Sequence, residues 1–210
     1  PRTDRADLEK YHEDLIVCSA CIAGEVPSKI LKGDIAGARE ACEWYHNLFG
    51  DDYYLELQRH KVPDDPSLLA NREAYELQQK ANKVLIEFAR EYGIKLVCTN
   101  DCHFEDKETA EAHDHLLCIA TGKDLDDPNR MRYSKQEWFK TRQEMNDVFS
   151  DIPEALSNTL EVLDKVEIYS IDHGPIMPFF PIPESFGTEE QLRQRVSEQD
   201  LYKEFTSDEN

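Results

Sequence analysis

An apolar run near the middle of the chain, Ile94-Lys95-Leu96-Val97-Cys98-Thr99-Asn100, has the length and composition of a buried strand. Two similar runs precede it, Leu15-Ile16-Val17-Cys18-Ser19-Ala20 and Tyr53-Tyr54-Leu55-Glu56-Leu57. In the intervals 34–50 and 71–92, apolar residues recur at spacings of three and four, which is typical of helices. The order strand, helix, strand, helix, strand predicts parallel βαβ units, in which helices cover the strands.

Helix ends are marked by residues that suit helix termini. Asp and Thr side chains accept hydrogen bonds from the free N–H groups of a first turn, and glycine adopts the left-handed conformation that ends a helix. Helices are expected to begin at Asp34, Asp106, Thr141 (with Glu144 completing a capping box) and Asp151. The first two are expected to end at Gly50 and Gly122, and the helix from about Asn71 at Gly93.

Composition excludes several classes of protein. The chain has 210 residues, 44 acidic and 24 basic, with a formal charge of −20. An apolar content of 40% is too high for a disordered acidic tail, and the charge argues against a nucleic-acid binder that acts alone. No apolar run is long enough to span a membrane, and no signal peptide is recognisable. Six sparse cysteines predict reduced thiols in a cytoplasmic protein, and Pro1 in place of Met predicts a piece of a larger chain.

Candidate metal ligands follow the first and third predicted strands. Asp101 and His103 come directly after the third strand, and alternate residues of an extended segment share a face. A carboxylate with an imidazole suits a divalent ion, although Asp101 as a turn cap and His103 as a surface residue is the simpler alternative. Of the pair Cys18 and Cys21, only Cys21 follows the end of its strand. If both strands belong to one parallel sheet, Cys21, Asp101 and His103 meet at one rim.

Other polar residues are weaker candidates. Glu56 and His60 flank the end of the second strand at the same rim, where they either support the ligands or form a solvated or hydrogen-bonded pair. His113 shares the apolar face of its helix and is predicted to be a core histidine. No glycine-rich phosphate loop, nucleophile elbow or HExxH pattern occurs.

Five segments in order carry a resemblance to a known family. They are Asp14-Leu-Ile-Val-Cys-Ser-Ala-Cys-Ile-Ala-Gly-Glu25, Asp52-Tyr-Tyr-Leu-Glu-Leu-Gln-Arg-His60, Leu96-Val-Cys-Thr-Asn-Asp-Cys-His-Phe104, Ala110-Glu-Ala-His-Asp-His-Leu-Leu-Cys-Ile-Ala-Thr-Gly-Lys123 and Asp126-Asp-Pro-Asn-Arg130. Together they resemble the bacterial replicative DNA polymerase III alpha subunits, in the amino-terminal PHP (polymerase and histidinol phosphatase) domain. The similarity runs from about Asp14 to Pro183.

The resemblance implies an architecture. The fold class is α/β, a partial (βα) barrel of the PHP type with parallel strands and outer helices, truncated at its N-terminal side. Residues 1–13 are expected to be a lead-in and residues 14–173 the partial PHP domain. Residues 174–210 are expected to be a Pro-rich connector that begins the segment leading to the polymerase palm.

The resemblance also implies a site and an activity. Cys21 fills the cysteine ligand position of the family, and Asp101 and His103 fill its closing Asp-x-His pair. The opening His-x-His motif and other ligands are expected upstream of Pro1, and the palm carboxylates downstream of Asn210. The parent protein is thus a DNA-directed DNA polymerase, whose PHP part carries a remnant 3′–5′ exonuclease-like phosphoesterase site for Zn, Mn or Mg. This chain alone is expected to be inactive and to bind metal weakly or not at all.

Partners and alternatives follow from the same resemblance. The expected partners are DNA, through the rest of the parent chain, and other polymerase III subunits, including the proofreading subunit and the sliding clamp. No membrane partner is expected. Truncation of the barrel predicts self-association through the exposed edge. The alternatives are a free-standing PHP metallophosphoesterase and a non-catalytic PHP module that docks replisome partners.

Overall fold

The computed structural model describes residues 3–63, 72–178, 187–188, 190–191 and 193–194. The chain divides into two units, Pro1–Glu167 and Ile168–Asn210. In the second unit, residues 168–178 form neither helix nor strand. Of the Pro-rich stretch expected at 174–183, residues 179–183 lie outside the described part of the chain. The fold and the candidate site therefore belong to the first unit.

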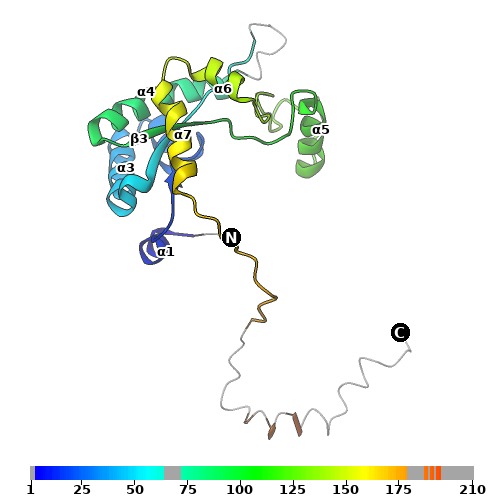
Figure 1. Ribbon diagram of the computed structural model, residues 1–210. Coiled ribbons are helices and arrows are strands. Elements are labelled where there is room, and N and C mark those ends of the chain that lie inside the picture. Colours follow the sequence, from blue (N-terminus) through cyan, green and yellow to red (C-terminus); the bar gives the residue numbers. More distant parts are fainter. Residues whose placement is uncertain (1–2, 64–71, 179–186, 189, 192, 195–210) are drawn as a thin grey trace. The chain divides into compact units, whose positions relative to one another are not determined.

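The first unit alternates strands and helices (Figure 1). The elements are α1 Arg5–Tyr11, β1 Val17–Cys18, α2 Glu25–Leu31, α3 Ile35–Phe49, the short 3-10 helix η1 Gly50–Asp52, β2 Tyr53–Gln58, α4 Glu73–Tyr92, β3 Lys95–Thr99, α5 Ala110–Thr121, α6 Arg142–Phe149 and α7 Pro153–Lys165. Among the described residues, no helix combines the length and apolarity needed to cross a membrane.

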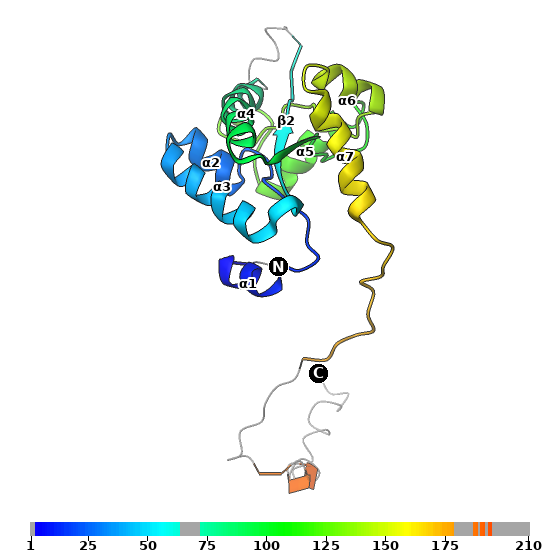
Figure 2. The same ribbon diagram turned by 60° about the vertical axis from the view of Figure 1, so that its left-hand side comes forward.

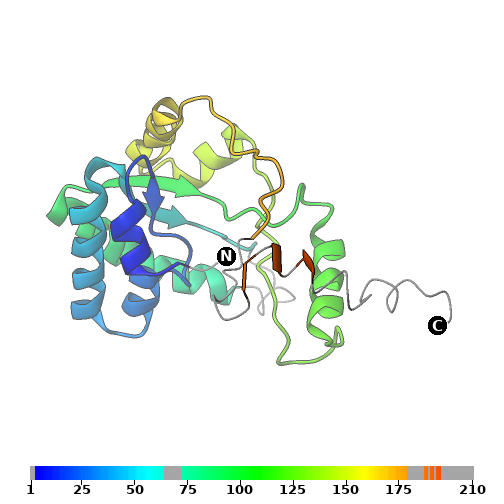
Figure 3. The same cartoon turned by 90° about the horizontal axis from the view of Figure 1, so that it is seen from below.

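The three strands form one parallel sheet in the order β1-β2-β3. Val17 pairs with Tyr53 at the start of the first ladder, and Leu55 pairs with Leu96 in the second. Figures 2 and 3 show α2 and α3 on one side of this sheet and α6 and α7 on the other. The predicted α/β class with parallel strands is confirmed, and the arrangement is consistent with part of a PHP-type barrel.

The two faces of β2 have different roles, as the period of two predicts. Tyr53, Leu55 and Leu57 point into the main apolar core, where Phe88 of α4 is also fully buried. Burial of each large apolar side chain stabilises the fold by about 1.5–3 kcal/mol. Tyr54, on the opposite face, instead donates a hydrogen bond to Glu161 of α7 (2.6 Å). One face of β2 therefore packs in the apolar core, whereas the other face, where Tyr54 and Gln58 are also buried, makes polar contacts.

Most predicted helix ends are confirmed. Asp34 accepts a hydrogen bond from Gly37 N (2.9 Å) at the start of α3. Thr141 and Glu144 form the complete capping box of α6. Gly93 ends α4 in the left-handed conformation, at φ +70°. These signals are reliable because each depends on contacts within one or two turns of the chain.

Other expectations at helix and strand ends are wrong. The first strand covers only Val17–Cys18 rather than 15–20, and the chain turns after it at Ala20, which is in the left-handed conformation (φ 63°). Asp106 does not cap α5; its carboxylate accepts from Thr109 N (2.9 Å), one residue before the helix. Asp151 does not cap α7 but binds Arg59 through two hydrogen bonds (2.5 and 2.9 Å).

A helix that the sequence analysis did not identify lies in the lead-in. Asp4 caps α1 by accepting a hydrogen bond from Asp7 N (3.0 Å). Arg5 links this helix to the rest of the first unit through an ion pair with Glu25 (2.7 Å), and its guanidinium lies over the ring of Trp44. No residue of α1 is fully buried and only Leu8 packs against the apolar core, so the helix lacks the apolar stripe that made the other helices recognisable.

Candidate functional site

The carboxyl ends of the three strands lie along one edge of the sheet, because all three strands are parallel and β2 lies between the other two. Cys21 follows the end of β1 by three residues. Asp101 and His103 follow the end of β3 by two and four residues. The topology therefore brings the three predicted ligands to the same edge of the sheet.

Glu56 of the middle strand links the ends of its two neighbours. Its Oε2 accepts a hydrogen bond from Ala20 N (3.1 Å), the residue before Cys21. Its Oε1 accepts from the hydroxyl of Thr99, the last residue of β3. Its own backbone N–H donates to Ser19 Oγ (2.8 Å). One side chain thus connects the turn that carries Cys21 to the strand end that leads to Asp101.

Both strand ends turn through a non-glycine residue in the left-handed region. Ala20 has φ 63° and Asp101 has φ 45°. Such conformations cost about 1–3 kcal/mol each and persist where surrounding contacts hold them. At Ala20 the contact is the hydrogen bond to Glu56. Strain at both ends of the predicted ligand set marks this edge of the sheet as a candidate functional site.

Asp101 and His103 are close neighbours, as the alternation argument predicts. Asp101 Oδ1 lies 3.5 Å from His103 Nε2, and each side chain is about one-third exposed. The His103 ring packs against Tyr133, with 4.5 Å between ring centroids. Burial, followed by the charges of Asp101, Glu137 and Cys21, raises the pKa of Tyr133.

The residues present do not make a complete metal site. Within the described ranges of the chain, no three His, Cys, Asp or Glu side chains are grouped as an ion would require. A zinc ion in a protein normally has three or four protein ligands, and Asp101 with His103 supplies two. The assignment of Cys21, Asp101 and His103 as ligands stays a prediction.

A later segment covers the end of β3. Asn100 donates two hydrogen bonds from its amide nitrogen, to Gln136 O (2.9 Å) and to Trp138 O (2.7 Å). His103 N donates to Glu137 O (2.8 Å), and Phe104 forms an isolated parallel bridge with Trp138. Residues 136–138 therefore lie beside the chain that leaves β3 and fix the course of the segment that carries His103.

A buried carboxylate anchors this covering segment. Glu137 is 2% exposed, and its Oε1 lies 3.2 Å from Nδ1 of His60, which is also buried. Ser134 donates to the same oxygen from both its N–H (3.0 Å) and its hydroxyl (2.6 Å). Burial alone would raise the pKa of Glu137, but the hydrogen bonds from His60 and Ser134 outweigh it and lower the pKa to about 2. His60 is therefore part of a hydrogen-bonded network, with Glu137 rather than with Glu56.

Lys140 is a further residue that sequence reasoning missed. Its Nζ lies 3.6 Å from the centroid of the Trp138 ring and donates to Asn100 Oδ1 (3.1 Å) and to Gln136 O. Burial lowers the pKa of Lys140 to about 8. No pattern in the sequence indicated this residue, whereas Ser134-x-x-Glu137 has the spacing of a capping box and was a usable signal for Glu137.

Helix α5, which follows the site in the sequence, stands apart from the sheet at the end of the extended chain that leaves β3 (Figures 1 and 3). Its His113 is only half-buried and packs against the rings of His103 (5.9 Å), Phe104 (5.1 Å) and Tyr133 (5.2 Å). The core position predicted for His113 is thus wrong, because the apolar residues around it belong to the site edge rather than to the main core.

Two comparisons, with a family model and with individual proteins, show what this chain is similar to. A family model described as "PHP domain" matches residues 1–60. Relatives named "DNA polymerase III subunit alpha" match nearly the whole chain: that of Borreliella burgdorferi is 38% identical over 99% of it, that of Campylobacter jejuni 35% over 91% and that of Treponema pallidum 33% over 96%. The chain spans only 17%, 16% and 16% of the length of these relatives.

Proposed function

Because the chain is similar over nearly all its length to one segment of the DNA polymerase III alpha subunits, we propose that it works as the PHP region of such a subunit. The observation that carries this proposal is the 33–38% identity over 91–99% of the chain. The whole protein is then a DNA-directed DNA polymerase of the cytoplasm that acts on DNA with other polymerase III subunits, including a proofreading subunit and a sliding clamp. These relatives favour this function over that of a free-standing PHP phosphoesterase.

In this proposal the strand-end edge is the remnant of a divalent-metal phosphoesterase site. Cys21, Asp101 and His103 are the residues that would hold an ion, and the ion would supply an activated water for attack on a phosphodiester. Support comes from the 3.5 Å contact between Asp101 and His103 and from the place of Cys21 after the end of β1, at the same edge of the sheet. Among the residues that the structure describes, no three potential ligands are grouped, so we expect the chain alone to be inactive.

A direct assay tests the proposed inactivity of the isolated chain. The purified 210-residue protein is incubated with 3′-labelled single-stranded DNA and with a primed template, in Mn²⁺, Mg²⁺ or Zn²⁺. We expect neither hydrolysis nor primer extension. Metal-dependent hydrolysis that Asp101→Ala removes and that Asp124→Ala, in an exposed loop, leaves intact would overturn the proposal.

The second candidate is a non-catalytic module that docks replisome partners. One observation favours it: Leu116 and Ile119, one turn apart on α5, are 59% and 79% exposed. Apolar side chains exposed together often mark an interaction surface. A Leu116→Ser, Ile119→Ser double variant of the whole parent protein should then lose binding to one of the other polymerase III subunits. Unchanged binding to each subunit would argue against this role.

A further inference from the structure

His60 is a buried ring whose two nitrogens face three partners. It lies two residues after the end of β2 and is 3% exposed. Its Nε2 lies 3.0 Å from Asn100 O, and because a carbonyl oxygen only accepts, this nitrogen carries a hydrogen. Its Nδ1 lies 2.9 Å from Nε2 of Gln78 and 3.2 Å from Oε1 of Glu137. One nitrogen atom is therefore shared between an amide donor and a carboxylate acceptor.

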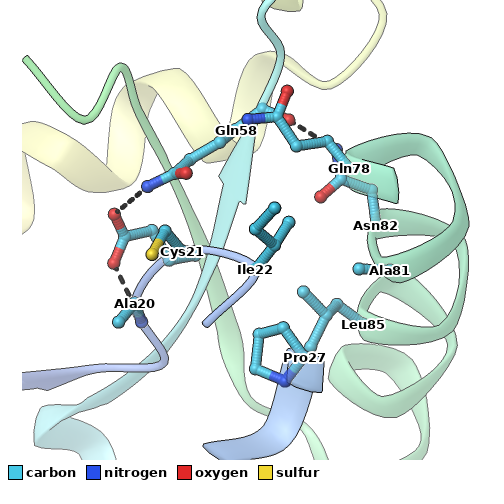
Figure 4. Close-up of a pocket in the computed structure, with 10 residues that line it drawn as sticks. Ala20, Cys21, Ile22, Pro27, Gln58, Gln78, Ala81, Asn82 and Leu85 are labelled. Carbon is cyan, nitrogen blue, oxygen red and sulfur yellow. Dashed lines mark hydrogen bonds between the residues drawn. The ribbon is translucent and has the colours of Figure 1, made fainter. Parts of the chain in front are cut away.

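A second contact fixes the orientation of the Gln78 amide. Its Oε1 accepts a hydrogen bond from His60 N (2.7 Å), so an amide turned the other way would place two donors against each other. Gln78 Nε2 consequently directs a hydrogen at Nδ1 of His60. Figure 4 shows Gln78 and Asn82 of α4 beside the end of β2, where Asn82 donates to Gln58 O (2.9 Å). This second amide holds α4 and β2 together without the His60 ring.

Glu137 is ionised and does not supply a hydrogen to the ring. Its Oε1 already accepts from the N–H (3.0 Å) and the hydroxyl (2.6 Å) of Ser134, and its Oε2 accepts from Gln136 N (2.9 Å). Three donors to one carboxylate favour its charged form. The contact between Nδ1 and Oε1 is therefore attractive only when Nδ1 carries a hydrogen of its own, and that hydrogen would face the one on Gln78. The two hydrogen bonds of Nδ1 exclude each other.

We propose that His60 is a proton-dependent switch between α4 and the covering segment 136–138. In the neutral ring, Nδ1 accepts from Gln78; in the protonated ring, Nδ1 donates to Glu137. Because the backbone oxygen of Glu137 accepts from His103 N (2.8 Å), protonation of His60 should tighten the chain that carries His103. Histidine is the side chain whose charge ordinarily changes near neutral pH. The switch does not depend on the proposed function.

The groups packed around the ring come from three parts of the fold. Gln78 from α4 and Asn100 after β3 are uncharged, and Glu137 from the covering segment is the carboxylate. Lys140 is a further titratable group nearby: it donates to Asn100 Oδ1 (3.1 Å), and burial lowers its pKa to about 8. Arg59, adjacent in the sequence, is engaged in an ion pair of its own. A test must therefore observe the His60 ring directly.

The test is an NMR titration of the purified 210-residue chain, with ¹⁵N-labelled histidine, from pH 5 to pH 9. The ¹⁵N shift distinguishes a protonated ring nitrogen from an unprotonated one. We expect Nδ1 of His60 to gain a hydrogen as the pH falls through this range, while Nε2 keeps its own. Exchange of the His103 amide, corrected for the intrinsic rate, should slow by about five- to tenfold over the same change. A His60 ring that keeps one state throughout, or a corrected exchange rate that is constant, would overturn the proposal.

Three variants separate the two partners of Nδ1. Gln78→Met removes the amide donor and should raise the proton affinity of His60 about tenfold, whereas Glu137→Gln removes the charged acceptor and should lower it about tenfold. Gln79→Met, at the exposed neighbouring position of α4, is the matched control and should leave the affinity unchanged. An unchanged or lowered affinity in Gln78→Met would refute the exchange of partners, and this result is decisive even if Glu137→Gln fails to fold.

Discussion

Replacement of Glu137 by Gln should destabilise the protein in a way that depends on pH. The lowered pKa of Glu137, about 2 against an ordinary 4.5, means that its ionised form is better stabilised in the folded state than in the unfolded state. The ionised carboxylate therefore stabilises the folded state. This stabilisation is complete well above pH 4.5 and is lost as the pH falls towards 2. The difference between the two pKa values corresponds to a contribution of about 3 kcal/mol to the free energy of unfolding at pH 7. At pH 3 this contribution falls to about 1.5 kcal/mol.

Urea unfolding at pH 7 and at pH 3 measures this difference between the wild type and Glu137→Gln. Glu108→Gln, which changes an exposed carboxylate just after the site, is the control and should have no effect at either pH. The variant should also accelerate hydrogen exchange at the amide of His103, which donates to Glu137 O. A loss below 1 kcal/mol at pH 7, or a loss that is the same at both pH values, would refute the account of the buried carboxylate.

Three further predictions concern stability and association. Arg130→Met should cost about 3–5 kcal/mol in urea unfolding, because it leaves Asp114, now held by two hydrogen bonds (2.6 and 2.7 Å), buried without its partner; a loss near zero would contradict this. Gly93→Ala (φ +70°) and Thr141→Ala should each lower the free energy of unfolding by about 1 kcal/mol, and unchanged midpoints would count against the assigned helix ends. Sedimentation should detect self-association through the outer edge of β1, Val17–Cys18; a monomer at all concentrations would disprove it.

The sequence predicted those parts of the fold that depend on local contacts. The caps at Asp34 and Thr141 and the left-handed end at Gly93 need only neighbours within a turn or two, and all three are confirmed. The alternation of strands and helices also predicted the parallel order of the sheet. Asp106 and Asp151 failed as caps because their carboxylates found other donors, Thr109 N and the side chain of Arg59. Local patterns cannot decide between a cap and a competing partner that the fold brings near.

The candidate site was predictable only in outline. Parallel strands place Cys21 and Asp101 along one edge, but the distance between them depends on the turn at Ala20. This turn is left-handed, and no glycine in the sequence marks it. The anchoring of the covering segment by Glu137 and His60 joins residues far apart in the sequence, and its energy comes from hydrogen bonds made at a buried position, which no spacing reports. A carboxylate in a polar stretch is normally expected to be solvated, so Glu137 had no signal beyond its spacing from Ser134.

The middle strand explains why fold and site depend on each other. Side chains alternate along β2, so the register that buries Leu55 and Leu57 also directs Glu56 and Gln58 to the opposite face. A shift of one residue would bury the carboxylate of Glu56 in the apolar core and leave Ala20 N–H and the Thr99 hydroxyl without their acceptor. The apolar core, which supplies most of the stability, therefore selects the one register in which a polar face joins the ends of β1 and β3. Substitutions that loosen the core should disturb the strand-end edge before they unfold the sheet.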